Sequence, residues 1–164
     1  MNKKERVAVY IDGGNTYQRL KEVGIPEKST RFDFSVFVKH LVGERELISK
    51  RYYVGVVKNF DGSAKGEQMV NGGAIREKGV DVKLAVDLVI GAADNIYDTA
   101  IVVSSDTDLI PAIKYVRKAK DKTVEHVGFG ANPSLGMIKE SSVSRLFSKT
   151  DLVQFQKIKS DSAS

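Results

Sequence analysis

Two kinds of hydrophobic run alternate along the chain. Short runs rich in β-branched and aromatic residues are typical of strands buried in a sheet. Longer stretches place apolar residues three and four positions apart, which is typical of helices with one buried face. The pattern predicts strands at 7–12, 47–57, 80–85, 100–105 and 123–129, and helices at 15–24, 33–42, 68–78, 85–97, 104–120 and within 133–147.

Strands and helices follow one another about five times, which favours a three-layer α/β/α domain with a mostly parallel sheet of about five strands. We expect the first strand at the centre, the next two on one side of it and the last two on the other. The 164 residues are 41% hydrophobic, enough for one domain with its own core. We expect this Rossmann-like domain to cover 1–153, followed by a polar tail at 154–164.

Carboxylates follow two of the expected strands directly. Asp12 ends the first strand, Asp106 ends the fourth, and Asp108 comes two residues later. Asp87 falls in the first turn of the helix expected at 85–97. Ligands of parallel α/β sheets bind at the carboxyl ends of the strands, where the strand order reverses. We therefore expect all four acids to line one pocket at that edge.

Four ionised carboxylates repel one another, by roughly 4 kcal/mol for a pair about 4 Å apart at a surface-like dielectric constant. A cation among them offsets that repulsion. The chain has no cysteine and two histidines, which excludes disulfides, thiolate sites and an ordinary zinc centre. Oxygen ligands suit Mg²⁺ or Mn²⁺, and these ions activate water for phosphodiester hydrolysis. The pattern therefore favours a metal-dependent phosphodiesterase.

Each acid also has a purely structural interpretation. Asp106 and Asp108 are typical of residues that cap the helix after a strand. Asp87 is compatible with the exposed face of an amphipathic turn. Asp12 differs because it follows a buried strand and precedes two glycines, which let a ligand approach the backbone. The metal hypothesis rests on the combination of the four acids.

Three motifs occur along the chain: YIDGGN near the start, KGVDVKLAVDLVIGA in the middle and VVSSDTDL later. In this order and spacing they resemble the NYN family, the LabA-like branch of the PIN-domain ribonucleases, over 7–127. The resemblance implies a PIN-like fold and Mg²⁺- or Mn²⁺-dependent cleavage of RNA, in which a metal-bound water attacks phosphorus and leaves a 5′-phosphate. The catalytic and metal-binding positions that it implies are Asp12, Asp87, Asp106 and Asp108, with Asn15 to orient the site. Ser105 departs from the family's Ser-Gly-Asp pattern, in which glycine is usual.

The net charge of +5 and the pI near 9.3 permit binding to a polyanion. We expect single-stranded or looped RNA, contacted by Lys58 and Arg76 on either side of a glycine-rich segment, with Phe60 as a stacking residue. Lys83, inside the middle motif, is a candidate for a phosphate contact, and Tyr17 is a candidate for base stacking. Exposure to solvent for Lys83 and ordinary packing for Tyr17 are the alternatives.

Other functions stay open at this point. One is a non-catalytic RNA-binding or regulatory module that keeps the fold. Another is a phosphatase of small phosphoesters, although the first strand lacks the DxDxT pattern of an aspartyl nucleophile. Apolar helix faces are compatible with a homodimer. The longest apolar runs are too short for a membrane span or a secretory signal, so we expect a cytoplasmic protein with no membrane partner.

Overall fold

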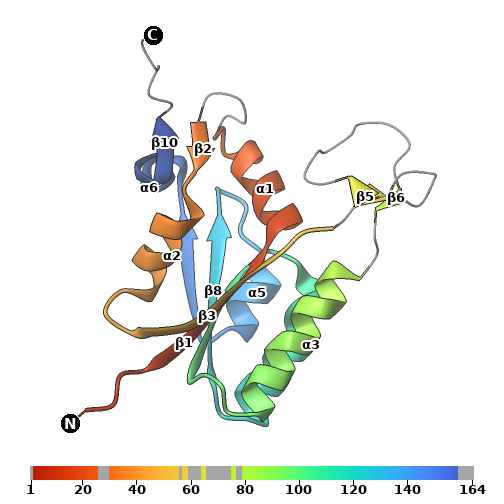
Figure 1. Ribbon diagram of the computed structural model, residues 1–164, viewed down its shortest axis with the longest axis vertical. Coiled ribbons are helices and arrows are strands. Elements are labelled where there is room, and N and C mark those ends of the chain that lie inside the picture. Colours follow the sequence, from red (N-terminus) through yellow and green to blue (C-terminus); the bar gives the residue numbers. More distant parts are fainter. Residues whose placement is uncertain are drawn as a thin grey trace.

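A five-stranded parallel sheet forms the centre of the computed structural model, which describes residues 2–25, 30–55, 57–58, 64–65, 75–76 and 79–158 (Figure 1). Its strand order is β3-β1-β7-β8-β9, and every neighbouring pair is parallel. The strands are β1 (Arg6–Asp12), β3 (Glu46–Tyr53), β7 (Thr99–Val103), β8 (Thr123–Phe129) and β9 (Val143–Phe147). The predicted fold class is therefore confirmed.

Helices cover both faces of the sheet and complete the three layers. One face packs against α1 (Gly13–Glu22), α2 (Phe34–Val42) and α6 (Lys149–Leu152). The other packs against α3 (Val80–Ala93), α4 (Ile110–Lys118) and α5 (Leu135–Glu140). Side chains of β1 alternate between the two cores: Val7, Val9 and Ile11 enter the first, and Ala8 and Tyr10 enter the second. This alternation follows from the twofold period of a strand.

Two predictions for elements of the main sheet were wrong. Residues 80–85 form the first turns of α3, not a strand, because Leu84 and Leu88 lie one turn apart and are both buried against the sheet. The short alternation of VDVKLA fits either structure, and packing decided for the helix. The fifth strand is β9, which lies inside the segment predicted to be helical at 133–147. As a result β3 alone lies beyond β1, while β1 and β7 are neighbours as predicted.

Smaller elements join the main sheet to the rest of the chain. The strand β2 (Thr30–Phe32) pairs with β10 (Gln156–Ile158), after the short helix η2 (Val153–Phe155). The strand β4 (Val57–Lys58) pairs with β5 (Ala64–Lys65) and β6 (Ile75–Arg76), whereas a helix was expected at 68–78. Phe60, 68–74 and 77–78 lie outside the described residues. Within the described ranges, no helix has the length and hydropathy needed to cross a membrane.

The helix α3 lies unusually close to the sheet at Gly91. A Cβ atom there would lie 2.7 Å from Cε1 of Tyr97 and 2.8 Å from the hydroxyl oxygen of Tyr10. The Tyr97 hydroxyl in turn donates a 2.6 Å hydrogen bond to the carbonyl oxygen of Leu88. Glycine is needed here for the close approach of the last turn of α3 to Tyr10 and Tyr97.

Replacement of Gly91 by alanine tests this close approach. Alanine favours a helix over glycine by about 1 kcal/mol, whereas overpacking a buried site costs about 1–3 kcal/mol. Because both tyrosines are buried, we expect overpacking to win and the free energy of unfolding to fall by ~1–2 kcal/mol. Urea unfolding measures the change. Ala93→Ser, at an exposed position of the same helix, is the matched control and should stay within about 0.5 kcal/mol of wild type. Undiminished stability in Gly91→Ala would contradict the tight packing.

Candidate metal centre

Asp12 is the buried acid at the carboxyl edge of the sheet. It is the last residue of β1, in register with Tyr53 at the end of β3, and only 8% of its surface is exposed. Its place in the strand alternation puts it on the side of Ala8 and Tyr10, the side covered by α3 and α4. One carboxylate oxygen accepts a 3.2 Å hydrogen bond from the backbone N–H of Asn15 and so caps α1. The other accepts a 3.0 Å hydrogen bond from the Ser104 hydroxyl.

The charge of Asp12 is only partly compensated by these hydrogen bonds. Burial raises the pKa of its carboxyl group above the ordinary value, and the bonds from Asn15 and Ser104 oppose that rise. The negative charges of Asp106 and Asp81 raise the pKa further. Asp12 therefore lies within electrostatic reach of both acids, in surroundings that favour an added positive charge.

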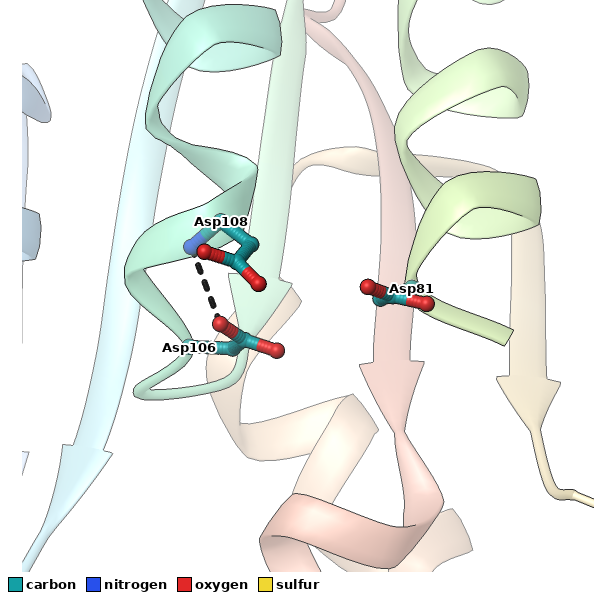
Figure 2. Close-up of side chains that lie close together, drawn as sticks. All are labelled: Asp81, Asp106 and Asp108. Carbon is teal, nitrogen blue, oxygen red and sulfur yellow. Dashed lines mark hydrogen bonds between the residues drawn. The ribbon is translucent and has the colours of Figure 1, made fainter. Parts of the chain in front are cut away.

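Three more carboxylates meet beside Asp12, from two different segments (Figure 2). Asp81 lies in the first turn of α3, while Asp106 caps the helix η1 (Thr107–Leu109) and Asp108 lies within it. One oxygen from each lies within 4.8 Å of the others. The backbone N–H of Asp108 donates a 2.9 Å hydrogen bond to Asp106, which holds the turn in place. Figure 2 shows Asp81 facing this pair across the space between the two helices.

The loop that carries Asp106 is tied to α1 by Asn15. The side-chain oxygen of Asn15 accepts hydrogen bonds from the backbone N–H of Ser105, at 2.9 Å, and from its hydroxyl, at 3.0 Å. The same hydroxyl accepts a 2.8 Å hydrogen bond from Nε of Arg19. The serine in place of a glycine thus adds two hydrogen bonds between α1 and the acidic loop. Asn15 therefore connects α1 to the loop that carries Asp106.

The structure places Asp87 away from this cluster. Its carboxylate accepts a 2.8 Å hydrogen bond from the Tyr53 hydroxyl and forms a 2.9 Å ion pair with Arg51 on β3. Asp81 and Asp87 are six positions apart on α3, so their side chains point about 120° apart around the helix. The helix begins at Val80 rather than at residue 85, which puts Asp81, not Asp87, in its first turn. The helical spacing of Asp81 with Leu84 and Leu88 is the sequence signal from which this earlier start could have been predicted.

Asp87 has a basic partner, whereas the three clustered acids have none in the described part of the chain. Arg51 neutralises Asp87. Among the residues with described side chains, no lysine or arginine forms an ion pair with Asp81, Asp106 or Asp108. Carboxylates that crowd together without a basic partner suit a hard divalent cation with oxygen ligands. The cluster with Asp12 beside it therefore fits a Mg²⁺ or Mn²⁺ site.

The predicted RNA-contacting residues are spread around this edge. Tyr17 is half-buried on α1, and Lys83 is exposed on α3. Lys83 follows Asp81 by two positions, so it projects about 160° away from that acid around the helix. The backbones of Lys58 and Arg76 lie in the small antiparallel sheet of β4 and β6. Their side chains lie outside the described part of the structure.

Comparisons with known proteins agree with this fold. The family model of the NYN domain matches residues 6–148. The crystal structure of a protein of unknown function from Vibrio parahaemolyticus is similar, with 20% sequence identity and a TM-score of 0.69. The similarity covers 96% of this chain and 100% of that chain. No curated protein matches the chain.

Metal titration distinguishes Asp81 from Asp87. We expect Asp81→Asn to weaken Mn²⁺ binding at least about tenfold, or about 1.4 kcal/mol, because it removes one of the clustered oxygen ligands. Asp87→Asn is the matched control on the same helix and should bind Mn²⁺ like wild type, because Arg51 and Tyr53 already engage that carboxylate. Isothermal titration calorimetry measures both affinities, and circular dichroism checks that both variants fold. Equal losses in the two variants would contradict the choice of Asp81.

Proposed function

Because the chain belongs to the NYN domain family, whose members are generally nucleases, we propose that it is a ribonuclease that depends on Mg²⁺ or Mn²⁺. The observation that carries the proposal is the convergence of Asp81, Asp106 and Asp108 beside the buried Asp12. These acids come from the first turn of α3, the turn after β7 and the end of β1. The motifs around them also support membership of the LabA-like branch.

In this proposal the four acids hold the cation. When bound, the cation supplies Lewis-acid chemistry: it lowers the pKa of a coordinated water and neutralises charge on a phosphodiester. Hydrolysis forms a bond from the water oxygen to phosphorus and breaks the bond from phosphorus to O3′. The products are therefore a 3′-hydroxyl and a 5′-phosphate. This chemistry needs no nucleophilic side chain, which agrees with a cluster made of carboxylates.

The remaining residues of the site position these acids. Ser104 and the amino end of α1 fix the carboxylate of Asp12 through two hydrogen bonds. Asn15 holds the loop before Asp106 through Ser105, so that a shift of α1 would move two acids together. We keep Tyr17, Lys58, Arg76 and Lys83 as proposed RNA contacts.

Cleavage of labelled single-stranded RNA tests the proposal. We expect wild type to cleave it in Mn²⁺ or Mg²⁺, to stop when EDTA is added and to leave 5′-phosphates that mass spectrometry detects. Asp12→Asn and Asp106→Asn should lower the cleavage rate at least about a hundredfold, because each removes a charge that holds the cation. Asp87→Asn should retain most of the activity.

Two outcomes would overturn the proposal. Unchanged cleavage in both Asp12→Asn and Asp106→Asn, with folding verified by circular dichroism, would trace the activity to another site or to a contaminant. RNA binding by wild type without any metal-dependent cleavage would make the protein a non-catalytic RNA-binding module.

A further inference from the structure

An apolar groove of about 630 Å³ runs between α3 and α4. Asp81 and Asp108 line it, and these are two of the three clustered acids. Its other lining residues are apolar, apart from the hydroxyl of Tyr115. Val86 and Tyr115 are 47% and 42% exposed there, and Val82 and Ile90, which also line the groove, are 59% and 50% exposed. The groove is thus continuous with the candidate metal centre but opposite to it in polarity.

We propose that this groove binds an unpaired nucleobase of the RNA whose phosphate lies at the acidic cluster, an inference that rests on the proposed ribonuclease function. A nucleotide is a ligand with an anionic end and an apolar, flat end. A site that joins a cation-binding cluster to an apolar groove matches both ends. Ligand pockets of about 300–1,000 Å³ are usual for small molecules, so the groove has room for a base with its sugar.

The part of the groove that lies away from the acids has an aromatic ring and positive charges that suit a bound base. Tyr115 supplies the aromatic face on which a base can stack, and base stacking on aromatic side chains tolerates any sequence. The ammonium group of Lys120 lies 5.9 Å from the centroid of that ring. Lys114 and Lys118 are exposed on the same helix. The Lys120 ammonium group lies over one face of the Tyr115 ring, and a positive charge there complements the phosphates that flank a base bound against the ring.

The same geometry opposes a second copy of the chain as the occupant. In a twofold dimer the same patch faces itself, so Asp81 and Asp108 of each copy would face either the apolar part of the partner's groove, which would strip water from their charges, or the partner's own acids. Like charges brought together at an interface cost several kcal/mol. Base binding instead places the acids, with their cation, at the phosphate.

The consequence is selectivity for unpaired nucleotides. A base inside a duplex is stacked on both faces and paired at its edge, so it enters a groove between two helices only after a few kcal/mol of unpairing and unstacking. Single-stranded segments and loops present their bases without that cost. The groove therefore accounts for a preference for single-stranded RNA through its own shape.

Fluorescence titration with a short single-stranded RNA that carries 2-aminopurine tests the inference. Ca²⁺ replaces Mn²⁺ in this assay. Ca²⁺ also binds oxygen ligands and neutralises the acids, and the titration then measures RNA binding and not cleavage. We expect Tyr115→Ala to weaken binding about tenfold or more, because stacking of one base is worth about 1–3 kcal/mol. Tyr115→Phe should restore most of the affinity. Val86→Glu should also weaken binding, whereas its control Val153→Glu, at a similarly exposed valine outside the groove, should not.

The outcomes separate this inference from the proposed function. Wild-type affinity in folded Tyr115→Ala and Val86→Glu would overturn the groove assignment, even if Asp106→Asn still abolished cleavage. Binding that depends on Tyr115 in a protein that cleaves no RNA would overturn the proposed ribonuclease function alone. Sedimentation of wild type as a dimer and of Val86→Glu as a monomer, with equal RNA affinity, would assign the groove to contact between copies and overturn the inference.

Discussion

Burial of the Asp12 carboxylate is the constraint on which the rest of the site depends. A buried charge is costly unless hydrogen bonds or opposite charges compensate it. The structure provides two hydrogen bonds, from the amino end of α1 and from Ser104 after β7. These bonds join the first strand, its following helix and the neighbouring strand at one point. These bonds compensate only part of the cost of burial, so the pKa of the carboxyl group stays above its ordinary value. The negative charges of Asp81 and Asp106 raise this pKa further.

A divalent cation is the simplest partner for this arrangement. Asp87 lies on the same helix as Asp81, and its charge is balanced by Arg51. For Asp81, Asp106 and Asp108, the described side chains supply no such basic partner. Acids that are held together by backbone geometry and by Asn15, rather than by lysine or arginine, keep their oxygens available for a metal ion. The apolar groove then extends this charged edge along α3 and α4.

The packing of α3 on the core determines where its site residues lie. Gly91 lets the helix approach Tyr10 and Tyr97, and Leu84 and Leu88 bury its inner face. The same helix then presents Asp81 in its first turn and Val86 on the wall of the groove. A change in how α3 packs would therefore alter the acidic cluster and the groove together.

The sequence by itself determined the layers, the adjacency of the first strand and the strand that precedes Asp106, and three of the acids around the candidate site. Buried strands such as 7–12 are continuous apolar runs, and an acid directly after such a run must lie at the carboxyl edge of a parallel sheet, as Asp12 and Asp106 do. Only the tertiary structure decided where α3 begins. The stretch VDVKLA alternates like a strand, and its helical state depends on the burial of Leu84 and Leu88 against residues far away in the chain. Because α3 begins at Val80, Asp81 lies at the cluster. Asp87, six positions later, points about 120° away around the helix and pairs with Arg51.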